Sequence, residues 1–170
     1  TTDSLTGGVY RYDIATDAFT TLLAPGLLRS PQGLVLDAAG EYLYVANYSD
    51  GLYRVSVTNG EAVRVPVSDA ATDYGIDGLY RYGKRLIAIQ NGIRPHRVTA
   101  FDLSDDGTRI VGSQVLAANL PAFDEPTLGA LHGDSLYFVA NSHWNRFDRD
   151  NGLPEGLSGP IVLKLDLDHE

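Results

Sequence analysis

Side chains that carry oxygen recur at matching places along this chain of 170 residues. Three apolar runs each end in an asparagine, and Gln32 and Asp77 each stand directly before a glycine that opens another run. The asparagines are Asn47, Asn91 and Asn141. Calcium and similar hard divalent cations bind several carboxylate and amide oxygens, at about 2.3–2.6 Å. If the fold brings these positions together, they predict a divalent cation site, with calcium as the first candidate.

Each of these residues also has an ordinary structural interpretation. Asp77 precedes Gly78, so its carboxylate could shape a turn by accepting a hydrogen bond from the backbone. The three asparagines could satisfy backbone groups where strands end. Glu125 stands next to Asp124 and before Pro126, where it could add a carboxylate to the same site. The sequence leaves both interpretations open.

Further candidates lie in the segments that connect strands. A histidine can act as a general base near neutral pH, so His96 and His143 are candidates for contact with substrate. The longest connection, residues 142–160, contains the only tryptophan, Trp144, which could stack on a sugar ring or else be a buried structural residue. We therefore assign Asp77, Gln32 and Glu125 to metal binding, and Asp77 and His143 to catalysis. The predicted substrate contacts are Gln32, Asn91, Asn141, Trp144 and His96.

Other kinds of chemistry lack their sequence signatures. The chain has no cysteine, which excludes thiolate metal sites and a cysteine nucleophile, and it has no P-loop, dinucleotide fingerprint or nucleophile elbow. A net charge of −9 argues against nucleic acid or an anionic membrane as the partner. No apolar run reaches the roughly 18–20 residues of a membrane span. A small-molecule substrate is the expected partner, and the compartment stays open between secreted, periplasmic and cytoplasmic.

Short strands must position the candidate residues, and they follow a repeated pattern. The apolar runs 42–47, 86–91 and 136–141 each follow a tight turn and a short strand opened by glycine, and each precedes a third strand of alternating character. The asparagines that end them are 44 and 50 residues apart. Four-stranded units at a period of about 40–50 residues are typical of a β-propeller. An all-β propeller of antiparallel four-stranded blades is therefore predicted, with an irregular β-sandwich as the alternative.

The strands do not fill a whole propeller. Counted along the sequence, they form the two outer strands of one blade, two complete blades, and the three inner strands of another. The corresponding segments are 7–25, 30–68, 74–118 and 125–167. Natural proteins avoid unpaired sheet edges, so we expect further blades, from preceding residues or from another chain, to complete the ring.

Residues 30–47 and 75–79 carry a resemblance to a known family. With Pro31-Gln32-Gly33 and Ile76-Asp77-Gly78 before inner strands, they resemble the regucalcin/gluconolactonase family of six-bladed propellers. The resemblance implies a metal held by a Glu of the first blade and by an Asn and an Asp of later blades. In lactonases of the family, this metal polarises the lactone carbonyl and activates water. Asp77 matches the family Asp, Gln32 stands where the family has Asn, and the first-blade Glu would precede Thr1.

Two functions follow as expectations. The first is a metal-dependent hydrolase of the lactonase type that acts on a small lactone or a sugar-derived ester in the central channel. The second is a non-catalytic propeller, similar to NHL propellers, that binds a glycan, a peptide or a protein. Gln32 favours the second function, because its side chain is one methylene longer than the family Asn.

Overall fold

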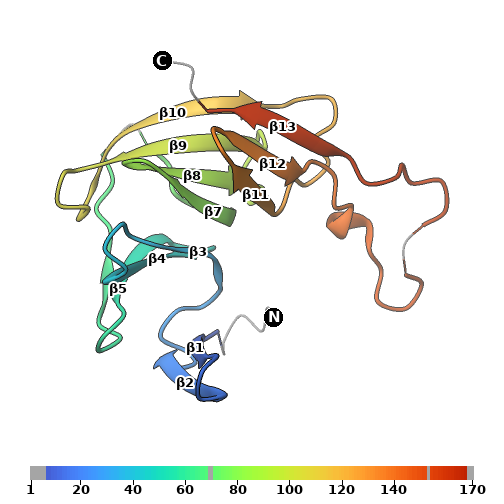
Figure 1. Cartoon of the computed structure of the whole chain (residues 1–170). Helices are drawn as coiled ribbons and strands as arrows, with labels where there is room; N and C mark the ends of the chain where they lie inside the picture. The colour runs from blue at the N-terminus through green and yellow to red at the C-terminus, as the bar shows by residue number, and fades with distance from the viewer. Residues whose placement is uncertain (1–6, 69–70, 153, 168–170) are drawn as a thin grey trace.

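The computed structural model describes residues 7–68, 71–152 and 154–167, and its strands form four antiparallel sheets. Figure 1 shows these sheets following one another around a curve in chain order, from β1 and β2 to β13. Over the described ranges the 13 strands divide into sheets of two, four, four and three. The predicted all-β fold with blade-like sheets is confirmed.

Each sheet is made of strands that follow one another along the chain. The first sheet pairs β1 (Val9–Asp13) with β2 (Ala18–Leu23). The second contains β3 (Pro31–Leu36), β4 (Tyr42–Asn47), β5 (Gly51–Ser56) and β6 (Ala62–Arg64). The third contains β7 (Ile76–Tyr82), β8 (Arg85–Gln90), β9 (Arg97–Leu103) and β10 (Ile110–Ala118). The fourth contains β11 (Gly129–His132), β12 (Ser135–Val139) and β13 (Val162–Asp166).

Tight turns set the register of the inner hairpins. Tyr82 pairs with Arg85 across a two-residue loop whose first residue, Gly83, has a φ of 58°. A left-handed backbone at that position suits the turns that match the twist of a hairpin, and glycine adopts it without steric cost. A two-residue loop of the same kind joins β11 to β12, where His132 pairs with Ser135 and Gly133 has a φ of 56°. The turn residues therefore fix which side chains of β7 and β8 lie opposite one another.

The core lies between adjacent sheets. The middle strands β4 and β8 are buried almost throughout, because apolar side chains on both of their faces pack against neighbouring sheets. One apolar cluster joins the second and third sheets through Tyr44, Ile76 and Phe101. Another joins the third and fourth sheets through Ile89 and Phe138. Each sheet is thus stabilised chiefly by contact with the next one.

Tyrosine hydroxyls add polar links between neighbouring sheets. The Tyr44 hydroxyl donates to the Gly107 carbonyl oxygen at 2.7 Å. The Tyr80 hydroxyl accepts a hydrogen bond from the Gly129 N–H at 2.6 Å. Aromatic side chains favour strands and bury large apolar surfaces, while their hydroxyls can still find a polar partner. Tyrosine therefore serves both purposes at the sheet-to-sheet boundaries.

The glycines that open the inner strands stand where two backbones meet. A Cβ on Gly33 would lie 2.6 Å from the backbone nitrogen of Leu79, in the inner strand of the next sheet. A Cβ on Gly78 would lie 3.0 Å from the carbonyl oxygen of Thr127. Side chains are excluded there because the inner ends of the strands converge. This convergence brings the residues beside these glycines, Gln32 and Asp77, toward one another.

Some boundaries differ from the sequence prediction. β6 ends at Arg64 rather than Val67, because Pro66 has no N–H to donate to a sheet. β12 ends at Val139, two residues before Asn141, which instead forms an isolated bridge with Asp124. The connection after β12 contains one short 3-10 helix, η1 (Trp144–Arg146). Within the described ranges no helix has the length and hydropathy needed to cross a membrane.

Candidate functional site

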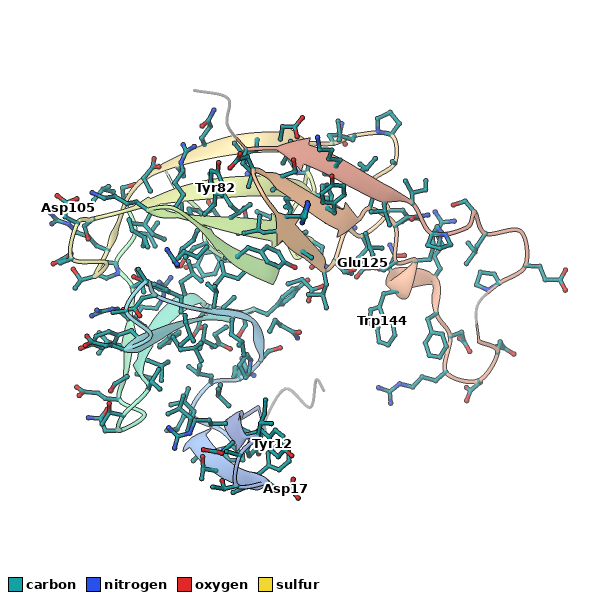
Figure 2. The ribbon with its side chains drawn as sticks, in the orientation of Figure 1. Tyr12, Asp17, Tyr82, Asp105, Glu125 and Trp144 are labelled. Atoms are coloured by element: carbon teal, nitrogen blue, oxygen red, sulfur yellow. The ribbon has the colours of Figure 1, made fainter. Side chains whose placement is uncertain are left out.

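A cleft of about 560 Å³ lies where inner strands of three sheets converge. Gln32 of β3, Asp77 of β7 and Glu125, shortly before β11, all line it. Figure 2 shows Glu125 and Trp144 close together on the concave side of the row of sheets. The other lining residues are Ser30, Tyr48, Asn91, Thr127, Leu128, Ser142 and Trp144. Five residues that the sequence singled out therefore share one cleft.

Two β-bulges position the first two of these side chains. The register of β7 on β8 passes from Ile76 to Gly78 and leaves Asp77 as the extra residue. The register of β3 on β4 shifts in the same way between Pro31 and Leu34, around Gln32. A bulge bends its strand and redirects one side chain, and bulges are common beside active sites. The resulting geometry aims Gln32 and Asp77 at the cleft.

Asp77 is the end of a short chain of hydrogen bonds. The Asn91 amide Nδ2 donates to Asp77 Oδ2 at 2.9 Å, and the Tyr48 hydroxyl donates to Asn91 Oδ1 at 2.8 Å. Burial raises the pKa of Asp77, the hydrogen bond from Asn91 opposes that rise, and the negative charge of Glu125 adds to it. A second, like charge across the cleft thus makes the ionised form of Asp77 costly.

Glu125 is held by the connection that contains Trp144. Its Oε2 accepts a hydrogen bond from the Asn145 N–H at 2.7 Å. Its carbonyl oxygen accepts from the Ser142 hydroxyl at 2.9 Å. Glu125 has a φ of 61°, a left-handed backbone that is uncommon for residues other than glycine. This conformation sends Glu125 into the cleft while its neighbour Asp124 lines a different pocket.

Backbone hydrogen bonds join the segments that line the cleft. The Asn91 and Gly92 N–H groups both donate to the Gly75 carbonyl oxygen at 3.1 Å, and the Gly75 N–H donates to the Tyr48 carbonyl oxygen at 2.9 Å. A Cβ on Gly75 would lie 2.6 Å from Gly92 Cα, so neither glycine has room for a side chain. The segments after β4 and β8 are therefore tied directly to the start of β7.

The available donors suit a hard cation. Asp77 and Glu125 supply carboxylate oxygens, and Gln32 commits its amide nitrogen to the Ser30 hydroxyl at 3.1 Å rather than its carbonyl oxygen. The Asn91 carbonyl oxygen already accepts from the Tyr48 hydroxyl at 2.8 Å, so it is not counted among the ligands. Among described residues, no group of three or more His, Cys, Asp and Glu side chains could hold a metal. A site here would combine two carboxylates with an amide oxygen, which is a donor set that calcium accepts.

The other two asparagines satisfy the backbone. Asn47 Oδ1 accepts from the Ser30 N–H at 2.7 Å. Asn141 Oδ1 accepts from the Ile161 N–H at 2.6 Å, and its Nδ2 donates to the Gly159 carbonyl oxygen at 3.0 Å. Asn91 alone of the three points its amide at cleft side chains.

Neither candidate histidine lines the cleft. His96 is 8% exposed, and its Nδ1 accepts from the Glu125 N–H at 3.3 Å, while its Nε2 has no hydrogen-bond partner. Burial lowers the pKa of His96, and the positive charge of Arg94 lowers it further. His143 and Asn141 line a separate pocket of about 370 Å³. The structure therefore does not bring His143 to Asp77.

Trp144 is exposed at the border of the cleft. Its ring stacks on Phe147, with centroids 5.6 Å apart and planes 8° from parallel. Trp144 is 66% exposed and Phe147 is 44% exposed. This is the open arrangement, rather than the buried structural tryptophan that the sequence also allowed.

Tyr48 is a cleft residue that the sequence reasoning missed. Burial raises the pKa of its hydroxyl, and the negative charges of Asp77 and Glu125 raise it further. The only signal was its place directly after Asn47, at the end of an apolar strand. Its role depends on contact with Asn91, which is 43 residues away in the sequence.

No protein-family model matches the sequence, and no curated protein matches it. Among solved structures, the fold is similar to a chain in the crystal structure of a nidogen/laminin complex, with a TM-score of 0.57 and 15% sequence identity. The alignment covers 94% of this chain and 68% of that chain. The match is with the six-bladed propeller of nidogen. At this identity it shows the fold alone: antiparallel sheets resembling part of a propeller.

Proposed function

We propose that this protein is a hydrolase of the lactonase type that depends on a divalent cation, with calcium as the first candidate. Its substrate would be a small lactone or a sugar-derived ester. The observation that supports the proposal is the meeting of Gln32, Asp77 and Glu125, from three sheets, in one cleft large enough for such a molecule.

Asp77, Glu125 and Gln32 would hold the cation. When bound, it would supply Lewis-acid polarisation of the ester carbonyl and a lowered pKa for bound water. Asn91 keeps Asp77 oriented through its amide, and Tyr48 in turn orients Asn91. Trp144 offers an exposed ring at the border of the cleft, where it can cover a bound sugar-like ring and exclude water.

The family resemblance adds to this proposal. Ile76-Asp77-Gly78 resembles the metal-binding motif of the regucalcin/gluconolactonase family, and here Asp77 is the bulged residue that lines the cleft. Gln32 replaces the family Asn, so a cation would lie one methylene farther from β3. Glu125 supplies a carboxylate within this chain, whatever residues a complete propeller adds.

Calcium titration and lactone hydrolysis test the proposal together. We expect the wild type to bind calcium in a calorimeter and to hydrolyse a gluconolactone in a reaction that EDTA stops. Asp77→Ala should lower both the affinity and the rate by about 100-fold or more, because it removes a direct ligand. The matched control is Asp105→Ala, which removes an exposed surface carboxylate paired only with Lys84 at 2.8 Å and should leave both unchanged. Hydrolysis that ignores EDTA and survives Asp77→Ala would overturn the proposal.

A second candidate is a binding module without catalysis. The exposed Trp144–Phe147 stack is a platform of the kind that binds sugar rings or aromatic peptide side chains. The structural match to a chain of a nidogen/laminin complex also favours it, since that propeller was crystallised with a protein partner. In this case Trp144→Ala abolishes binding to a glycan or peptide array, while Asp77→Ala leaves the calcium isotherm unchanged.

A further inference from the structure

The pocket that contains His143 joins three residues from distant parts of the sequence. His143 Nδ1 lies 2.9 Å from Asp124 Oδ2, and His143 Nε2 lies 3.3 Å from the Ser158 hydroxyl oxygen. Asp124 precedes β11, His143 follows β12, and Ser158 precedes β13. An aspartate, a histidine and a serine in contact in this order form the arrangement that activates a serine hydroxyl, which is identified by geometry and not by position in the sequence.

The surrounding contacts select one tautomer of His143. Asn141 Oδ1 accepts from the Ile161 N–H at 2.6 Å, so its amide nitrogen is the end that faces the pocket. That nitrogen lies 3.1 Å from His143 Nε2 and 3.1 Å from the Ser158 hydroxyl oxygen. Asp124 Oδ2 lies 2.9 Å from His143 Nδ1, and a carboxylate only accepts hydrogen bonds, so Nδ1 carries the proton and Nε2 keeps its lone pair for the Ser158 hydroxyl. This is the tautomer that a general base needs.

The same contacts also suit the protonated histidine. The Ser158 carbonyl oxygen lies 3.2 Å from Nε2, where it can accept a hydrogen bond once that nitrogen carries a proton. Asp124 remains beside Nδ1 as the counter-charge, and Arg146 holds Asp124 Oδ2 at 2.8 Å. The neutral and the protonated imidazole of His143 therefore both have hydrogen-bond partners at Nδ1 and Nε2.

His143 keeps its position at a conformational cost. Its φ is 53°, in the left-handed region that residues other than glycine seldom occupy. The residue is only 9% exposed, whereas Ser158 lies at the surface. A strained, buried base behind an accessible hydroxyl is a combination found at functional sites.

We propose that Ser158 is a nucleophile, with His143 as its general base and Asp124 as the residue that orients His143. The substrate class is a small carboxylic ester, bound in the pocket lined by Phe123, Leu157 and neighbouring residues. This site shares no residue with the predicted metal ligands, so its activity is independent of a divalent cation.

The reaction balances with water as the only co-reactant. Ser158 Oγ bonds to the ester carbonyl carbon, and its proton passes to His143 Nε2. The tetrahedral adduct collapses, the C–O bond to the leaving alcohol breaks, and Nε2 returns the proton to that alcohol. Water then attacks the acyl-serine with His143 as base, which releases the carboxylic acid and restores Ser158. Asn141 Nδ2 lies 3.1 Å from Oγ and is the side-chain donor that we assign to the oxyanion.

A fluorophosphonate probe tests the nucleophile directly. Ser158 Oγ forms a bond to phosphorus, fluoride leaves, and the protein gains the mass of one phosphonyl group. We expect one adduct, located on Ser158 by peptide mass spectrometry and unaffected by EDTA. Ser158→Ala should abolish it, and His143→Ala should slow it by about 100-fold or more, which is the usual contribution of a general base. The matched control Ser113→Ala removes an exposed serine of β10 and should label like the wild type.

A cysteine variant gives a second readout that does not depend on the probe. These 170 residues contain no cysteine, so Ser158→Cys and Ser113→Cys each carry a single thiol. A thiol beside His143 should react with iodoacetamide at pH 7 about tenfold faster than the thiol at position 113, because a neighbouring histidine raises the thiolate fraction. Adding His143→Ala to Ser158→Cys should remove the excess rate.

Two results would overturn the proposal. One is labelling of other residues only, or labelling that is unchanged by Ser158→Ala. The other is equal alkylation at positions 158 and 113, with circular dichroism showing both variants folded. EDTA distinguishes this site from the cleft. If chelation stops lactone hydrolysis but Ser158 is still labelled, the two activities belong to different residues.

Discussion

At the scale of single residues, the carboxylate of Asp77 is less stable in its cleft than it would be in water. Burial and the charge of Glu125 raise its pKa, and the hydrogen bond from Asn91 offsets only part of that effect. A carboxyl whose pKa is raised by folding favours the folded state when it is protonated. That contribution is present below the unfolded pKa of about 3.9 and is lost as the pH rises through the folded value. Without a cation, ionised Asp77 therefore destabilises the fold at neutral pH.

Asp77→Asn should stabilise the protein in EDTA at pH 7.5, because the neutral amide keeps an oxygen for Asn91 and removes the buried charge. We expect the melting temperature to rise by about 1–4 °C. The gain should shrink at pH 4.5, where more of the wild-type carboxyl is protonated. Calcium should raise the melting temperature of the wild type but not of the variant. A variant that melts below the wild type at pH 7.5 would contradict this account.

Some of these residues could be predicted from the sequence, and others could not. Gln32 and Asp77 were found because they precede glycines, and those glycines are required where inner strands converge. The contact of His143 with Asp124 could not be predicted, because it depends on left-handed backbone at Glu125 and His143. Glutamate rarely adopts this conformation, so nothing around Glu125 indicated it from the sequence alone.

At the scale of elements, the segment before β7 is held by one buried amide. Gln90, at the end of β8, donates from Nε2 to the carbonyl oxygens of Thr72 and Tyr74, both at 2.8 Å. Its carbonyl oxygen accepts from the Thr99 hydroxyl at 2.7 Å and from Arg97 at 3.0 Å. All four hydrogen-bonding capacities of this amide are used. The loop that delivers Asp77 to the cleft is thus tied to the middle of its own sheet.

Gln90→Leu should destabilise the fold by about 2–4 kcal/mol, since it leaves two carbonyl oxygens and two donors without their partner. It should also weaken calcium binding severalfold, because the loop before Asp77 is released. Urea unfolding and calorimetry measure the two effects. The control Gln114→Leu changes an exposed glutamine of β10 that accepts a solvent-exposed hydrogen bond from Arg85 at 3.0 Å, and it should shift stability by less than about 0.5 kcal/mol. Equal effects of the two substitutions would show that Gln90 does not hold the loop.

The elements themselves were largely predictable. Apolar runs and tight turns locate β4, β8 and β9 to within a residue, because a buried middle strand must be apolar on both faces. The ends of β6 and β12 were not, because Pro66 and the bridge of Asn141 to Asp124 act there. The end of β6 thus follows from a local proline, whereas the end of β12 depends on a contact between distant segments.

At the scale of the whole molecule, the net charge of −9 gives the protein a negative long-range field. Such a field raises the local concentration of cations and is screened by salt, with a Debye length of about 10 Å at 0.1 M. Part of any calcium affinity should therefore come from charges that never touch the ion.

Raising sodium chloride from about 20 mM to about 500 mM should weaken calcium binding severalfold, because screening removes the long-range attraction. The measurement is a series of calorimetric titrations at fixed pH. Labelling of Ser158 by a neutral fluorophosphonate should change little over the same range and serves as the internal comparison. Calcium affinity that is independent of salt would mean that the contacting oxygens alone supply it.

Asp124 and Glu125 are consecutive residues that line two different pockets. A substitution that alters the backbone at either position should change the lining of both pockets. Substitutions of residues that line the two pockets beside this dipeptide should therefore combine non-additively, although the pockets share no side chain.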